Sequence, residues 1–159
     1  MGPRPVELLA HASDETRAVM TQPEPIEFEG IVNAGLGEGA RFTAIDWVGA
    51  ALRRATGFDP WPGTLNLRLD ETAQRAWQRA QHLYPGIVID PAPGFCPARC
   101  HLLWLAGRVR AAAVVPEVDG YPADKLEIVA PVALREALGL RDGNRVRVRV
   151  AALGPTTVS

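Results

Sequence analysis

Short segments in which apolar residues alternate with polar ones constrain the fold of this chain most strongly. Residues 26–31 place Ile26, Phe28 and then Ile31 against glutamates, and residues 146–150 place a valine at every second position. A period of two is typical of a strand with one buried face. The same pattern in residues 65–69 directs three leucines to one side and leaves Thr64 and Asn66 together on the other.

Further strands and three helices complete the expected elements. The apolar segments 100–107 and 109–116 predict neighbouring, central strands, and residues 125–131 predict another. One helix is expected within residues 43–58, with Gly57 as its stop, and a second after the N-cap Asp70. A third is expected to begin at Pro131 and end at Gly139.

Short strands, many turns and few, separated helices favour a mainly β fold, a small closed β-barrel decorated by about three short helices. We expect residues 25–153 to form a single domain, between an N-terminal arm of residues 1–24 and a tail of residues 154–159. No apolar run is long enough for a signal peptide or a membrane span, so we expect a cytoplasmic protein without a membrane partner.

The charge balance favours a small-molecule partner. Seventeen basic and 18 acidic residues give a net charge of -1, which provides no global basic surface for nucleic acid. We therefore expect no nucleic-acid partner. The alternating Arg145, Arg147 and Arg149 form a basic strand face, which keeps a DNA-binding module as an alternative.

Two cysteines lie close to a histidine. Cys96, Cys100 and His101 are one ligand short of a closed zinc site. Ordinary buried thiols are the favoured interpretation, because free cysteine behaves as a small hydrophobic residue.

Three segments contain residue types suited to phosphate chemistry. Gly35, Gly37 and Gly39 can expose backbone amides to an anion, although a hairpin or bulge accounts for them equally well. Thr64 and Asn66 offer two hard oxygen atoms, about 7 Å apart along the strand, to a cation such as Mg²⁺. The alternative is a strand edge facing water.

The third segment contains Glu127 and Arg135. Glu127, in an otherwise apolar strand, either points outward or serves as an orienting group or general base. Arg135, in the helix that follows, is either an ordinary surface charge or a phosphate contact.

In this order, "GIVNAGLGEGARF", "GFDPWPGTLNLRL" and "AAAVVPEVDGYPADKLEIVAPVALREALGLRDGNRVRV" resemble the archaeal type of CTP-dependent riboflavin kinase. The resemblance runs from about residue 30 to residue 150, and residues 71–110 align mostly by length. It implies a six-stranded cradle-loop, RIFT-like barrel. The implied activity is Mg²⁺-dependent transfer of the terminal phosphoryl group of CTP to the ribityl hydroxyl of riboflavin, giving FMN and CDP.

The resemblance also assigns roles to residues. Thr64 and Asn66 would bind Mg²⁺, and Glu127 would contact the flavin. Glu127, with Glu38 as the second candidate, would orient the ribityl hydroxyl and accept its proton. The implied nucleotide contacts are Leu36, Gly37, Glu38, Gly39, Ala40, Arg41, Val132, Ala133, Leu134 and Arg135.

Two positions depart from the family pattern. Asp119 stands where the family usually has a threonine that touches the flavin, so a different small-molecule alcohol is an alternative acceptor. Arg41 stands where an aromatic residue is common. The flavin ring also needs an apolar slot, for which Phe95, Trp104 and Tyr121 are candidates unless they are ordinary core or surface residues.

Overall fold

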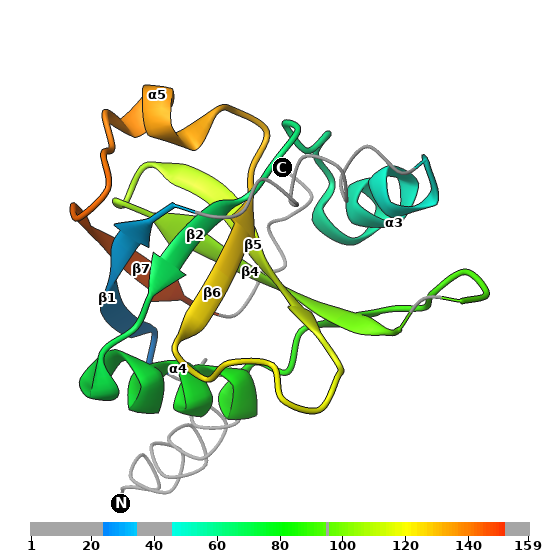
Figure 1. The fold of residues 1–159 in the computed structure, drawn as a ribbon, viewed down its shortest axis with the longest axis horizontal. Coiled ribbons are helices and arrows are strands. Elements are labelled where there is room, and N and C mark those ends of the chain that lie inside the picture. Colours follow the sequence, from blue (N-terminus) through cyan, green and yellow to red (C-terminus); the bar gives the residue numbers. More distant parts are fainter. Residues whose placement is uncertain (1–23, 35–45, 95, 152–159) are drawn as a thin grey trace, which may run out of the picture.

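Six antiparallel strands close into a barrel in the computed structural model, which describes residues 24–34, 46–94 and 96–151 (Figure 1). The strands pair in the order β4-β5-β6-β2-β1-β7, and β7 pairs back with β4. Their bounds are β1 (Ile26–Asn33), β2 (Leu65–Arg68), β4 (Ala98–Leu105), β5 (Val109–Pro116), β6 (Lys125–Val129) and β7 (Arg145–Val150). A seventh strand, β3 (Ile87–Ile89), pairs with β4 and lies outside the ring. The expected mainly β, six-stranded barrel is confirmed.

Alternating side chains fill the barrel interior, as the strand periodicity predicts. The inward residues include Leu65 and Leu67 of β2, Leu126 and Ile128 of β6, and Val146, Val148 and Val150 of β7.

The prediction for β1 was wrong at one position. Gly30 and Val32 are buried, whereas Ile31 is only half-buried. A strand directs every second residue inward, so the inward set after Phe28 continues with the glycine.

Two helices cover different parts of the barrel. α4 (Glu71–Leu83) crosses one end, where Ala73, Trp77 and Ala80 join the interior cluster (Figure 1). Its expected N-cap, Asp70, accepts a 2.8 Å hydrogen bond from the Ala73 amide. α3 (Asp46–Thr56) packs on the outer face of β4, β5 and β6 through a second cluster, formed by Val48, Ala51, Leu52, Ile89, Ala98, Cys100, Ala112, Val114 and Val129.

The third helix is shorter than its sequence suggests. α5 (Leu134–Leu138) ends as expected at Gly139, which adopts a left-handed conformation with φ of 63°. The prediction that it begins at Pro131 was wrong, because Ala133 is still extended, with ψ of 102°. The Ala130 carbonyl accepts a 2.7 Å hydrogen bond from the Trp61 amide. This contact joins the start of the non-helical segment to the chain that precedes β2.

Several expectations fall outside the described residues. These are the arm apart from Glu24, the tail of residues 154–159, the start of the first helix and the whole glycine loop. Among the residues that are described, no helix is long and apolar enough to cross a membrane.

Candidate functional site

A groove of about 270 Å³ lies between the chain that enters β2 and the chain that leaves β6. It brings Thr64, a predicted metal ligand, together with the predicted nucleotide segment Val132–Arg135. These two parts of the sequence meet because β2 and β6 are antiparallel neighbours in the barrel. The lining residues are Trp61, Pro62, Gly63, Thr64, Leu65, Ile128, Ala130, Val132, Ala133, Leu134, Arg135 and Glu136.

Polar side chains continue from this groove across the outer face of three strands. Asn66 lies directly opposite Asn33 of β1 and Glu127 of β6 in the strand register. Their neighbours in β2 and β6 point into the barrel, so these side chains face outward, and Thr64 lies on the same face two residues before Asn66. The face therefore offers hydroxyl, amide and carboxylate oxygens. This donor set fits Mg²⁺, which prefers oxygen ligands.

Glu127 belongs to a small polar cluster with Lys125 and Tyr121. Its carboxylate is 25% exposed and forms a 2.9 Å ion pair with Lys125. The Lys125 Nζ lies 5.7 Å from the centre of the Tyr121 ring. Burial raises the pKa of Tyr121 above its usual value, and the negative charge of Glu127 raises it further. The Tyr121 hydroxyl is buried beside the Glu127 carboxylate, and as a neutral phenol it can donate to that carboxylate.

Arg135 connects α5 to the end of β1. Its Nη2 atom lies 2.7 Å from Asp142 and 3.5 Å from the Asn33 carbonyl oxygen. The predicted nucleotide loop begins just beyond β1, so Arg135 is positioned near its start. The loop residues themselves, Leu36–Arg41, lie outside the described part of the chain.

Other candidates do not reach the groove. Asp119 is exposed in the loop between β5 and β6, which lies at the other end of β6 from α5 (Figure 1). Trp104 lies opposite Arg110 and Arg149 at the junction of β5, β4 and β7, and it does not line the groove. Phe95 is not among the described residues.

The expectation of ordinary buried thiols is confirmed for Cys100 and wrong for Cys96. Cys96 is exposed and Cys100 is buried. Cys100 and His101 are consecutive in β4, so their side chains point to opposite faces. Burial raises the pKa of Cys100 to about 12. Within the described residues, no three His, Cys, Asp or Glu side chains come together as a metal site.

The arginines of β7 face glutamates of β1. Arg145 lies 3.7 Å from Glu29, and Arg149 lies 3.5 Å from Glu27. The expected basic strand face is therefore part of a surface of mixed charge.

The sequence interpretation missed Trp61. It lies within "DPWPGTLN", directly before the predicted metal ligands, and it is 53% exposed at the groove. The signal that could have identified it is a large aromatic residue between two prolines, in a turn that leads into Thr64.

Comparison with known proteins shows which family the chain belongs to. The family model CTP-dep_RFKase, described as a domain of unknown function (DUF120), matches residues 32–150. The chain belongs to the CTP-dependent riboflavin kinase family. The matched range includes the predicted nucleotide loop, Thr64, Asn66, Glu127 and Arg135.

Relatives of this family are named riboflavin kinases. The chain is 37% identical to the protein of Methanosarcina acetivorans over 143 residues, which are 87% of this chain and 60% of the relative. It is 42% identical to the protein of Pyrobaculum arsenaticum, with 79% of this chain and 60% of the relative covered. The chain thus spans only about 60% of the length of these relatives. For the protein of Aeropyrum pernix, 39% identical, the match covers 77% of this chain and 94% of the relative.

Proposed function

We propose that this chain transfers the terminal phosphoryl group of CTP to the terminal ribityl hydroxyl of riboflavin, producing FMN and CDP. The observation that carries this proposal is the groove that unites Thr64 with Val132–Arg135, in a member of the CTP-dependent riboflavin kinase family. The Aeropyrum pernix relative supports it further, since the matched region is nearly the whole of a protein named riboflavin kinase.

The reaction requires the protein to position the two substrates, and it requires little covalent chemistry from protein side chains. The ribityl oxygen bonds to the γ-phosphorus, the bond from that phosphorus to the β-phosphate oxygen breaks, and the hydroxyl proton passes to the proposed acceptor, Glu127. The barrel wall and the turn before β2 are suited to holding two substrates in line for this step.

Thr64 and Asn66 are the residues that would hold Mg²⁺, whose charge, when bound, offsets that of the nucleotide phosphates. The remaining nucleotide contacts would come from Leu36–Arg41 and Val132–Arg135. Arg135 is suited to a phosphate, because its side chain already lies at the end of β1 where the glycine loop begins.

Glu127 is the proposed orienting group and proton acceptor for the ribityl hydroxyl. Its position opposite Asn66 places it beside the proposed metal ligands. Its ion pair with Lys125 holds the carboxylate in place on the outer face. Glu38 is the less favoured alternative for this role.

The direct test is FMN formation by the purified chain with riboflavin, CTP and Mg²⁺, followed by chromatography, with ATP, GTP and UTP in parallel. We expect FMN with CTP. The double variant Thr64→Ala, Asn66→Ala should lose FMN formation and keep the circular dichroism spectrum of the wild type. Thr72→Ala, an exposed threonine of α4, is the matched control and should keep full activity. Undiminished turnover of the double variant at ordinary Mg²⁺ concentrations would refute the assignment of the metal ligands.

Asp119 favours a second candidate, the same machinery acting on a different small-molecule alcohol. The exposed carboxylate occupies the position at which the resemblance implies a flavin contact. Conversion of CTP to CDP with another alcohol from an acceptor panel, and none with riboflavin, would support this alternative over the first.

A further inference from the structure

Trp61 is an exposed aromatic residue held on a constrained backbone. It lies between Pro60 and Pro62, so the ring of Pro62 restricts Trp61 itself to extended conformations. The Trp61 amide donates a 2.7 Å hydrogen bond to the Ala130 carbonyl. The 53% exposed side chain is therefore carried by a segment that needs little ordering when a ligand arrives.

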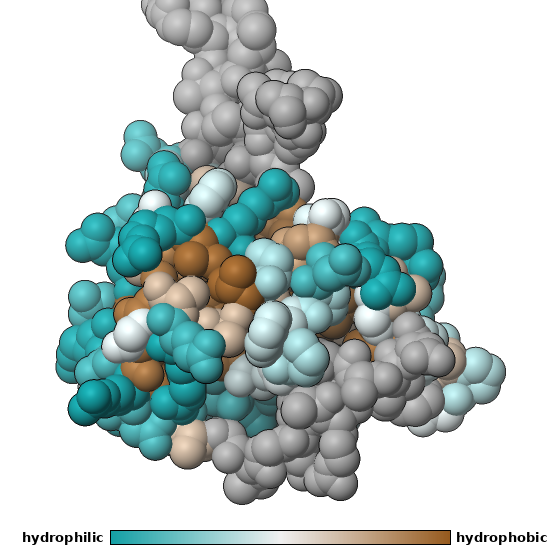
Figure 2. Space-filling view, turned by 90° about the horizontal axis from the view of Figure 1, so that it is seen from above, coloured by the Kyte–Doolittle hydropathy of each residue, from teal (hydrophilic) through white to brown (hydrophobic). Residues whose placement is uncertain are grey.

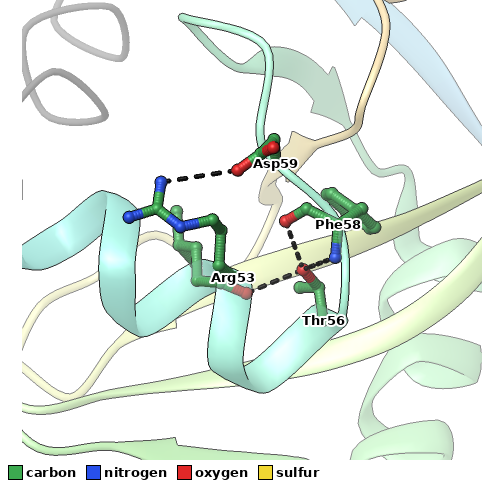
Figure 3. A network of polar contacts seen from close by, with 5 residues as sticks. Arg53, Thr56, Phe58 and Asp59 are labelled. Carbon is green, nitrogen blue, oxygen red and sulfur yellow. Dashed lines mark hydrogen bonds and ion pairs between the residues drawn. The ribbon is translucent and has the colours of Figure 1, made fainter.

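The other end of this segment is fixed at α3 (Figure 3). The Thr56 hydroxyl donates to the Leu52 carbonyl at 2.7 Å and accepts from the Phe58 amide at 3.1 Å. Arg53 lies 3.4 Å from Asp59, two residues before Trp61. The turn that carries the indole is thus attached to α3 on one side and to the end of β6 on the other.

The surface of the groove around Trp61 is polar and apolar in nearly equal parts, with polar groups from Thr64, Arg135 and Glu136. Figure 2, viewed from the end of the molecule where α5 lies, shows hydrophobic residues gathered within a rim of hydrophilic ones. The volume of about 270 Å³ is below the range of roughly 300–1,000 Å³ that encloses a whole drug-sized ligand. The groove is therefore suited to one part of a ligand, and the exposed indole that lines it favours a planar ring.

Two planar rings belong to the proposed reaction, the base of the nucleotide and the flavin. The residues that share the groove with Trp61 are Val132–Arg135, the segment proposed to contact the nucleotide. The positions proposed for the flavin, Asp119 and Glu127, do not line it. The distribution of lining residues therefore favours the base.

We propose that Trp61 is the stacking platform for the pyrimidine base of the nucleotide, between the turn before β2 and the segment that leads into α5. This proposal rests on the proposed function for the identity of the nucleotide. Stacking would bind the base through its face, while Thr64 and Arg135, which line the same groove, would serve the Mg²⁺ and the phosphates. Aromatic platforms bind bases in this way with a contribution that an alanine substitution reveals as about a tenfold or larger loss of affinity.

The test measures CTP affinity by calorimetry with Mg²⁺ and without riboflavin. Trp61→Ala should raise the Kd for CTP about tenfold, and Trp61→Phe, which keeps an aromatic face, should restore much of the affinity. Trp104→Ala is the matched control, an exposed tryptophan remote from the groove, and should bind CTP like the wild type. Inorganic triphosphate has no base, so Trp61→Ala should leave its affinity unchanged. Circular dichroism checks the fold of each variant.

Intrinsic fluorescence supplies a second readout. CTP should quench the tryptophan emission of the wild type and of Trp104→Phe, and this quenching should be lost in Trp61→Phe. An unchanged Kd for CTP in Trp61→Ala would overturn the inference, as would an equal loss of triphosphate binding. A raised KM for riboflavin with unchanged CTP binding would also overturn it, because the indole would then serve the flavin ring.

Failure of this inference and failure of the proposed function give different results. If the chain forms FMN and its CTP affinity does not depend on Trp61, the proposed kinase activity stands and the stacking role of Trp61 is refuted. If CTP binding depends on Trp61 but no FMN forms, the stacking role of Trp61 stands and riboflavin is refuted as the phosphoryl acceptor.

Discussion

Gly30 of β1 lies so close to Leu67 of β2 that the barrel wall has no room for a side chain there. A Cβ atom added to Gly30 would lie 2.8 Å from the Leu67 Cδ1 and 2.9 Å from its Cβ. Leu67 is only 1% exposed, so it has little space into which to move. This inward position of β1 therefore requires a glycine, because any larger residue would clash with Leu67.

We expect Gly30→Ala to lower the free energy of unfolding by about 1–3 kcal/mol, the usual cost of overpacking a core. Urea denaturation of the variant measures this loss. Glu29→Ala, at the neighbouring exposed position, is the control and should change stability by less than about 0.5 kcal/mol. Equal stability of Gly30→Ala and the wild type would show that Leu67 can shift without cost.

His101 is a second residue whose properties are set by its surroundings. It is 2% exposed, its Nδ1 atom lies 3.3 Å from the Tyr84 carbonyl oxygen, and its ring meets Trp77 edge-on at 5.1 Å. Burial lowers its pKa, Arg99 lowers it further, and the hydrogen bond to Tyr84 opposes the shift. The neutral ring that donates Nδ1–H to Tyr84 leaves Nε2 as a buried acceptor without a partner.

This environment predicts a loss of stability as the pH falls. The folded pKa lies below the unfolded value of about 6.5, so on acidification the unfolded chain takes up a proton first. The contribution of His101 to the free energy of unfolding is thus fully present above about pH 6.5, and it decreases as the pH falls below this value. Melting temperatures between pH 7.5 and 5 measure the effect. His101→Gln should flatten the pH dependence relative to His82→Gln, an exposed control, and identical slopes would contradict the prediction.

At the scale of elements, α4 depends on the side chain that begins it. Asp70 has an extended backbone, with ψ of 179°, and its carboxylate accepts the hydrogen bond from Ala73 that an N-cap requires. Gln74 adds a 2.9 Å hydrogen bond from its side chain to the Leu69 carbonyl. These contacts fix the helix where it crosses the end of the barrel and inserts Trp77 into the core.

Removal of the cap should therefore weaken the whole domain. We expect Asp70→Ala to reduce the free energy of unfolding by about 0.5–2 kcal/mol, whereas Asp70→Asn should retain most of the stability because asparagine also caps helices. Chemical denaturation of the two variants side by side measures the difference. If both variants lose equally, the charge of Asp70, and not its hydrogen bond, would be what stabilises the helix.

At the scale of the whole molecule, the contact of β4 with β7 closes the barrel. Leu105 lies opposite Val148, and both side chains are fully buried. The Ala106 amide extends this junction with a 2.9 Å hydrogen bond to the Arg147 carbonyl. Closure pairs both edges of the ring at this point, so its strands stabilise one another.

We expect Leu105→Ala to cost about 2–5 kcal/mol, the usual effect of such a truncation in a core. Unfolding should remain a single transition when it is followed by both circular dichroism and tryptophan fluorescence. Trp104→Ala, the adjacent outward position, should cost less. Two separate transitions in the Leu105 variant would mean that the β4–β7 junction opens independently of the remaining barrel.

The sequence by itself determined the features that depend on near neighbours in the chain. The strand period assigned the inward leucines of β2 and valines of β7, and local backbone chemistry assigned the Asp70 cap and the left-handed Gly139. The resemblance supplied the six-stranded barrel. Thr64 and Asn66 could be placed on one face because strand geometry alone requires it.

Only the tertiary structure decided the features that join distant segments. The pairing of β2 with β6 sets Asn66 opposite Glu127 and makes Val132–Arg135 the wall of a groove with Thr64. The hydrogen bond between Trp61 and Ala130 joins the turn before β2 to the end of β6, directly before the residue at which the sequence predicted a helix to begin. β1 packs so closely against Leu67 that the inward-facing residue is Gly30. Ile31, the next residue, faces outward and is half-buried. Sequence periodicity contains no information on which strands become neighbours, and in a closed barrel those neighbours determine the site.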